Sequence, residues 1–181
     1  LQINQTQRWA KKHRNALQTS YAKAPYFKDH LPFLEDVYGQ TWETLLPLMQ
    51  KTNDYFLKAL GIDTKIISST QIKPAGVKAD LVLNICKELG AKTYISGPFG
   101  RDYLNPQAFK DEGIELVFHD YDHPKYEQIH DGFEPYMSIV DLLFNCGPQS
   151  CSILEDQCGL NKLCIPRVSG DLLLPIDEFN C

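Results

Sequence analysis

The strongest constraint on the fold is that glycines and prolines divide the chain into segments of helical length and short segments typical of strands. Before Gly61, apolar residues recur at helical spacing over residues 8–24, 27–37 and 41–60, and these segments are predicted to be helices. Pro47 lies inside the third segment, so it must either kink that helix or lie in its first turn.

After this glycine the pattern alternates between strand and helix. Strands are predicted over residues 64–69, 92–96 and 114–118, which are short and mostly β-branched or apolar. Helices are predicted over residues 77–89 and from Asn105 onward, where an asparagine followed by a proline is typical of a helix start. Alternation at these lengths predicts parallel βαβ units with right-handed crossovers.

A later helix is predicted over residues 138–146, with Ser138 as its cap and Asp141 three residues further on. A further turn or two of helix is expected between residues 149 and 157. From Cys158 onward few local signals remain, and we expect a loosely packed tail.

Together these elements predict one α/β domain of residues 1–181, with a small parallel, Rossmann-like sheet flanked by helices. Its parts are a helical region over residues 1–62, a βαβ core over residues 63–147 and a helical or irregular tail over residues 148–181.

Charge and cysteine usage exclude several classes of protein. The net charge of −5 argues against a nucleic-acid binder. No apolar run approaches the roughly 20 residues that a membrane span needs. The six cysteines do not form the closely spaced pairs typical of a zinc knuckle, so no metal site is predicted, and a reduced, cytoplasmic protein is expected. Cys86, on an apolar helix face, is predicted to be a buried, inert thiol.

Polar residues gather after the predicted strands, in segments 68–80, 96–104 and 119–128. Ligands of open parallel sheets bind beyond the carboxyl ends of the strands, so we predict that these three segments share one site. In the first segment, Lys78 adds positive charge near a helix N-terminus, which favours an anion. The alternative is a capped helix with a solvated lysine.

The second segment holds the best candidate for anion binding. Its two glycines, Gly97 and Gly100, let the backbone approach a ligand closely. Ser96, Gly97 and Arg101 would hold a phosphate or carboxylate, which Arg101 can bind through two hydrogen bonds. Tyr103 offers a hydroxyl and a ring. The alternative is an ordinary turn whose arginine pairs with Asp102 or Asp80, since no nucleotide-binding motif is matched.

The third segment supplies candidates for proton transfer. His123 suits general acid or base catalysis, because histidine titrates near neutral pH, and Pro124 argues against a helical metal site there. Tyr126 and Gln128 are expected to position the substrate. His13 is a second catalytic candidate. The alternatives are a polar loop over the sheet and, for His13, a histidine packed on its helix face.

An ordered set of segments resembles the WbqC-like family of bacterial proteins. Their order and spacing carry the resemblance, which covers about residues 9 to 150. The segments are Trp9–His13, Tyr21–Phe27, Leu60–Ile62, Ser68–Ser69, Gly76–Asp80, Tyr94–Gly97, Tyr103–Leu104, Phe109, Gly113–Ile114, His123–Gln128, Phe133 and Ser138–Gly147. Members usually start with a strand and a Gln-Pro-x-Tyr segment that this sequence lacks, so we expect the chain to be part of a longer protein.

The resemblance implies a transferase that attaches an amino-acid or acyl group to an amino sugar in bacterial surface polysaccharide (O-antigen) biosynthesis. Its substrate would be a small anionic molecule, either a nucleotide sugar or an activated amino acid, and the sequence does not identify a cofactor. The alternative is a non-catalytic ligand-binding or scaffolding subunit, and an oligomer or a partner chain is compatible with both. A hydrolase ranks lower, because no Gly-x-Ser-x-Gly motif is present.

Overall fold

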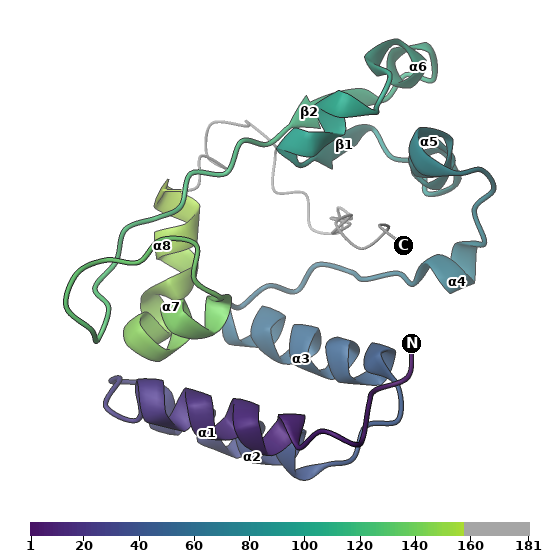
Figure 1. Ribbon diagram of the computed structural model, residues 1–181. Coiled ribbons are helices and arrows are strands. Elements are labelled where there is room, and N and C mark those ends of the chain that lie inside the picture. Colours follow the sequence, from purple (N-terminus) through teal and green to yellow (C-terminus); the bar gives the residue numbers. More distant parts are fainter. Residues whose placement is uncertain (158–181) are drawn as a thin grey trace. The chain divides into compact units, whose positions relative to one another are not determined.

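The computed structural model describes residues 1–157 of the chain (Figure 1). These residues form two compact units, which are described separately. Residues 1–63 and 123–157 form the helical unit, and residues 64–122 form the α/β unit. The sequence predicts a boundary between residues 62 and 63, and the structure divides the chain between residues 63 and 64.

The helical unit is built from pairs of packed helices. Its α-helices are α1 (Trp9–Tyr21), α2 (Phe27–Gly39), α3 (Leu45–Ala59), α7 (Ile139–Cys146) and α8 (Ser150–Gln157). Helices α1 and α2 lie side by side, and α2 also contacts α3 and α7 (Figure 1). Pro47 occupies the first turn of α3, where backbone amides have no partner within the helix. The prediction that this proline lies in a first turn, and does not kink the helix, is therefore confirmed.

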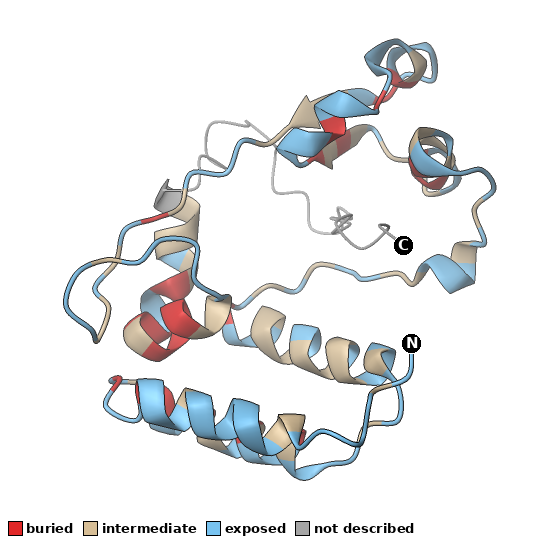
Figure 2. Ribbon diagram, viewed as in Figure 1, coloured by how far each residue is buried: buried red, intermediate tan, exposed pale blue. Residues whose placement is uncertain are grey.

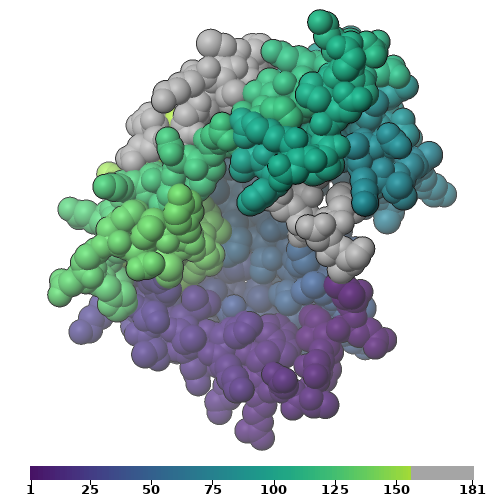
Figure 3. Space-filling view, turned by 45° about the horizontal axis from the view of Figure 1, so that its top comes forward, coloured from purple at the N-terminus to yellow at the C-terminus, as the bar shows by residue number. Residues whose placement is uncertain are grey.

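Helix α7 is the centre of this unit's core. Its Leu143 and Phe144 are each 1% exposed, and buried residues concentrate on this helix (Figure 2). The Phe144 ring lies 5.3 Å, centroid to centroid, from each of the rings of Tyr21, Phe27 and His30. On the surface, the segment of about residues 125–150 lies against the N-terminal helices (Figure 3). A helix that is apolar on most of its faces must be covered, and the elements around α7 cover it.

Gly147, which ends α7, gives a first prediction about stability. Its φ is +50°, and a Cβ built there would lie 2.5 Å from ring atoms of Tyr26. Gly147→Ala should therefore lower the free energy of unfolding by about 2–4 kcal/mol, through backbone strain and overpacking. Gly39→Ala is the control, because nothing lies within 4 Å of a Cβ there. Equal denaturation midpoints for the two variants would contradict the prediction.

His30 links the stability of the core to pH. It is 8% exposed, its Nδ1 is hydrogen-bonded to the Tyr55 hydroxyl at 2.7 Å, and burial lowers its pKa below the ordinary 6.5, partly opposed by Asp29. The unfolded chain therefore binds a proton at a higher pH than the folded chain. This contribution to stability is complete above the ordinary pKa of histidine and is lost as the pH falls from there towards the folded pKa.

We expect the free energy of unfolding to fall more steeply with decreasing pH in the wild type than in His30→Asn. Denaturant titrations between about pH 7.5 and 5.5 cover the range in which an unfolded histidine gains its proton. Parallel pH profiles for the two proteins would contradict the assignment of this linkage to His30.

The α/β unit contains one small parallel sheet. Its elements are α4 (Ser69–Ile72), α5 (Lys78–Glu88), β1 (Thr93–Ser96), the 3-10 helix η1 (Pro98–Asp102), α6 (Pro106–Asp111) and β2 (Glu115–Phe118). Strands β1 and β2 pair in parallel, from Thr93 opposite Glu115 to Ser96 opposite Phe118. A cluster of buried residues forms the core: Val82, Cys86, Tyr94, Leu104, Phe109 and Ile114.

The mixed α/β class and the strands at 92–96 and 114–118 are confirmed, and the sheet has two strands within the described residues. The strand predicted over residues 64–69 is wrong. Ser69 begins α4, and the Ser68 side chain accepts a hydrogen bond from the Thr70 amide. The Gln71 side chain accepts one from the Ser68 amide in return. This reciprocal capping offers the backbone an alternative to a strand.

Other local predictions are confirmed. Asn105 and Ser138 cap α6 and α7 through their side-chain oxygens, and α8 occupies the predicted segment 149–157. Cys86 is 3% exposed, and burial raises its pKa to about 11, so the thiol stays neutral. The tail predicted from Cys158 lies outside the described residues. Within residues 1–157, no helix is both long and apolar enough to cross a membrane.

Candidate functional site

The residues predicted to form the site lie in both units. The helical unit contains His13, His123, Tyr126 and Gln128. The α/β unit contains Lys78, Ser96, Gly97, Arg101 and Tyr103. Each group is described within its own unit.

Arg101 is already paired in the α/β unit. Its Nη1 and Nη2 donate to Oδ1 and Oδ2 of Asp120 at 2.7 and 2.9 Å, and its guanidinium lies 4.8 Å from the centre of the Phe118 ring. The pair lowers the pKa of Asp120 and raises that of Arg101. The partner is Asp120, after β2, in place of Asp102 or Asp80, so an anion at Arg101 would compete with this carboxylate.

The turn before Arg101 is tightly packed. Ser96 is 4% exposed, and its hydroxyl donates to the Gly97 carbonyl at 3.1 Å. A Cβ at Gly100 would overlap the Ser96 Oγ, so glycine is required for this close approach. Gly97 and Tyr103 are exposed, as is Lys78, the first residue of α5, whose φ is +50°. These exposed groups, rather than the Ser96 hydroxyl, are the accessible part of the predicted anion site.

The two predicted catalytic histidines of the helical unit both pack against aromatic rings. His13 is exposed on α1, with its ring 5.6 Å from Trp9 and 6.2 Å from Tyr38. His123 is half-buried, with its ring 5.8 Å from Phe133 and 5.2 Å from Tyr136. His13 is therefore packed against the aromatic rings beside its helix, which was the alternative to a catalytic role. His123 contacts Phe133, a residue of the pocket described below.

Tyr126 and Gln128 meet at Asp141, a carboxylate that is only 4% exposed in the first turn of α7. The Tyr126 hydroxyl and Gln128 Nε2 donate to its Oδ2 at 2.8 and 2.9 Å. Asn145 Nδ2 donates to its Oδ1 at 3.3 Å. The positive end of the helix dipole further stabilises the carboxylate at this position.

The phenols of Tyr21 and Tyr126 both respond to this carboxylate. Burial raises the pKa of each well above its usual range, and hydrogen bonding to Asp141 and its negative charge raise both further. Both hydroxyls therefore stay protonated across the physiological range. They act as neutral donors around a buried anion.

Gln128 also closes the loop that follows it. Its Oε1 accepts a hydrogen bond from the Glu134 amide at 2.8 Å, and its Nε2 donates to the Glu134 carbonyl at 2.9 Å. Together with the bond to Asp141, these contacts use both N–H groups of the side-chain amide. Gln128 therefore fixes the shape of the loop rather than offering a donor to a ligand.

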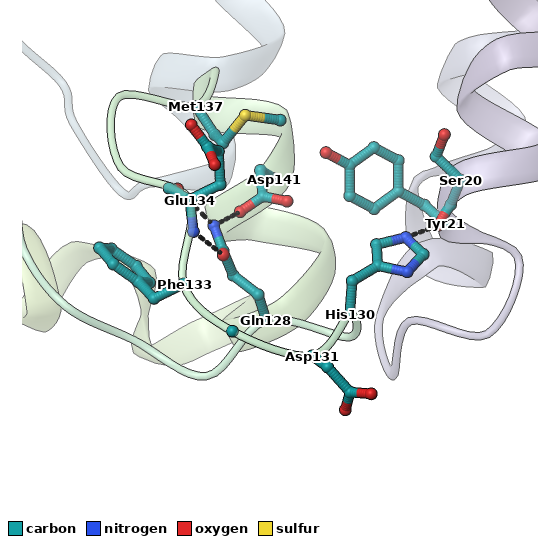
Figure 4. A pocket seen from close by; sticks show the side chains of 10 residues that line it. Ser20, Tyr21, Gln128, His130, Asp131, Phe133, Glu134, Met137 and Asp141 are labelled. Carbon is teal, nitrogen blue, oxygen red and sulfur yellow. Dashed lines mark hydrogen bonds between the residues drawn. The ribbon is translucent and has the colours of Figure 1, made fainter.

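This loop, the end of α1 and the start of α7 enclose a pocket of about 350 Å³ (Figure 4). The lining residues are Ser20, Tyr21, Gln128, His130, Asp131, Gly132, Phe133, Glu134, Met137 and Asp141. The imidazole Nε2 of His130 donates to the Ser20 carbonyl at 3.0 Å and so joins the loop to α1. All of these residues belong to the helical unit.

Of the residues that line this pocket, sequence reasoning named Gln128 as a site residue but not His130, Glu134 or Asp141. The reason is that it searched for polar residues after strands, whereas this pocket is built from helix ends and a loop. The available signal was Asp141 itself, an acidic residue followed directly by the apolar run Leu142–Phe144.

Fold and pocket together define a mixed α/β protein with a small polar site in its helical part. The chain belongs to the WbqC-like protein family, whose model matches residues 1–153, and the predicted resemblance is confirmed. It is 34% identical over 149 residues to the uncharacterized protein Rv1507c of Mycobacterium tuberculosis (strain ATCC 25618 / H37Rv). That match covers 81% of this chain and 64% of the relative, so the chain spans less than two thirds of the relative's length. No solved structure matches the chain.

Proposed function

We propose that the chain is part of a transferase that attaches an acyl or amino-acid group to an amino sugar in bacterial surface polysaccharide (O-antigen) biosynthesis, and that the pocket of the helical unit holds the acceptor sugar. The pocket carries this proposal. Its volume of about 350 Å³ lies at the lower end of the roughly 300–1,000 Å³ of small-molecule sites. Its lining combines hydroxyl and carboxylate groups, which suit the polar edge of a sugar, with the Phe133 ring, which suits its apolar face.

The transfer forms one bond and breaks one. The acceptor's ammonium group first gives a proton to a base. Its nitrogen then uses the freed lone pair to form a bond to the acyl carbon, whose bond to the leaving group breaks and gives the leaving group the electron pair. The second proton lost by nitrogen passes to the departing group. His130, which lines the pocket, joins His123 and His13 as a candidate for that base.

The α/β unit would hold the anionic donor. In this proposal the donor's phosphate or carboxylate takes the place of Asp120 on Arg101. Lys78, Gly97 and Tyr103 are exposed residues of the same unit. Guanidinium groups bind planar anions through paired hydrogen bonds, as Arg101 binds Asp120 here.

This donor site gives a prediction with opposite signs for two variants. Asp120→Asn should tighten the binding of a nucleotide such as UDP by up to about fivefold, because an exposed ion pair of this kind competes with at most about 1 kcal/mol. Arg101→Ala should weaken binding instead. Isothermal titration calorimetry measures both affinities. Equal affinities for both variants and the wild type would remove the anion-binding role of Arg101.

Saturation-transfer NMR with a panel of monosaccharides, including amino sugars, tests the acceptor site. We expect transfer to the ring protons of at least one amino sugar, and a loss of most of that signal in Phe133→Ala. Tyr136→Ala is the matched control, because Tyr136 belongs to the same loop, is 73% exposed and does not line the pocket. An absence of transfer to every sugar, or equal signals in Phe133→Ala and the wild type, would contradict the proposal.

The second candidate function is a non-catalytic ligand-binding subunit. It is favoured by one observation: His123 and His13, the histidines predicted to be catalytic, do not line the pocket. Mass spectrometry of an amino sugar incubated with the chain and an activated acyl donor separates the two functions. A mass increase in the sugar supports the transferase, and sugar binding without a mass increase supports the binding subunit.

A further inference from the structure

We infer that the pocket of the helical unit recognises a protonated primary amine, so that it takes its ligand as a cation and discriminates against the N-acylated form. The inference rests on the proposed function for the identity of the ligand as a sugar. The recognition of positive charge rests on the pocket alone.

The central observation is a buried negative charge that has no counter-ion. Asp141 is 4% exposed and lines the pocket, and its hydrogen-bond donors are neutral side chains: Tyr21, Tyr126, Gln128 and Asn145. Within residues 1–157, no lysine, arginine or histidine forms an ion pair with it. A carboxylate removed from water is costly unless its charge is compensated, and a cation in the pocket would supply that compensation.

The rest of the lining carries charge of the same sign. Glu134 and Asp131 are exposed residues on the pocket wall, and no lysine or arginine lines the pocket. His130 also lines the pocket, and its Nε2–H donates to the Ser20 carbonyl. A concave site lined by one sign of charge concentrates ligands of the opposite sign.

The loop holds these charges in place. Gln128 binds both the amide and the carbonyl of Glu134 and also donates to Asp141, so one side chain ties the wall of the pocket to its buried carboxylate (Figure 4). Burial raises the pKa of Tyr21 and of Tyr126, and their hydrogen bonds to Asp141 and its charge add to that rise. The negative site is therefore built into the fold before any ligand binds.

A primary ammonium group fits this site better than a neutral sugar does. Within residues 1–157, no group of three or more His, Cys, Asp or Glu side chains is placed to hold a metal ion. The ammonium group carries three N–H donors and one charge, and the pocket offers carboxylate acceptors. N-acylation removes the charge and leaves a single N–H donor. The product of the proposed transfer is therefore expected to bind more weakly than the acceptor, which favours its release.

Isothermal titration calorimetry with the full chain tests the inference with glucosamine, N-acetylglucosamine, glucose and cyclohexylamine. We expect glucosamine to bind at least about tenfold more tightly than N-acetylglucosamine and glucose, since hydrogen bonds to charged groups are among the strongest in proteins. Equal affinities for the three sugars would overturn the inference and leave the sugar site standing. Binding of cyclohexylamine without binding of any sugar would support the inference and refute the proposed function.

Charge-neutralising variants locate the effect. Glu134→Gln combined with Asp131→Asn should weaken glucosamine binding about fivefold and leave glucose unchanged, because the exposed carboxylates add to the field of Asp141. Glu43→Gln combined with Asp54→Asn is the matched control, because both residues are exposed in the same unit and do not line the pocket. An equal loss in the two double variants, or no loss in the first, would overturn the assignment to this pocket.

Discussion

Phe144→Ala should lower the free energy of unfolding of the chain by about 3–5 kcal/mol, the range for removing a large aromatic side chain from a core. Phe144 is 1% exposed and packs edge-on against Tyr21 and Phe27. Its removal leaves a cavity between α1, α2 and α7, and helix α7 also carries Asp141. We therefore expect the pocket to be lost together with the core.

Urea denaturation followed by circular dichroism measures this change. Phe99→Ala is the control, because Phe99 is 78% exposed and surface substitutions usually change stability by less than about 0.5 kcal/mol. A Phe144→Ala protein with the same midpoint as the control would show that α7 is not the centre of the core.

The second large effect is expected at Asp141. Asp141→Ala removes the acceptor of Tyr126 and Gln128 and leaves their partly buried donors unsatisfied, at about 1–3 kcal/mol for each group. A total loss of about 2–6 kcal/mol is expected, which is the sum over the two unsatisfied groups. Asp141→Asn should cost less, because it keeps one acceptor oxygen and removes the uncompensated charge.

The two Asp141 variants separate a structural role from a ligand-binding role. Asp141→Asn should fold and should show a smaller preference for glucosamine over N-acetylglucosamine than the wild type. Denaturation gives the stability, and calorimetry on the folded variant gives the preference. Wild-type stability in Asp141→Ala would contradict the hydrogen-bond account, and a preserved amine preference in Asp141→Asn would contradict the role of its charge.

Most of the helices could be predicted because their signals are local. The caps at Asn105 and Ser138 act within two residues, and Pro47 is tolerated where a helix amide has no partner. The error at residues 64–69 has the same origin, because β-branched composition outweighed the short capping box at Ser68 and Gln71.

The site was less predictable because it depends on contacts between distant segments. The pocket brings the end of α1 to a loop more than 100 residues away, through the bond between Ser20 and His130. The pairing of Arg101 with Asp120 likewise joins two turns that are 19 residues apart, and the sequence alone does not show that they meet. The sequence predicts that Tyr126 and Gln128 position a substrate, but it does not predict that both donate to Asp141.

The pKa of the bound amine tests the central claim most directly. The 15N chemical shift of 15N-labelled glucosamine, followed against pH with and without saturating protein, reports the protonation of its amino group. If the pocket compensates Asp141 with a cation, the pKa of the bound amine must lie above that of the free sugar, because nearby carboxylates favour the charged form. A pKa that is unchanged or lowered on binding would contradict the account.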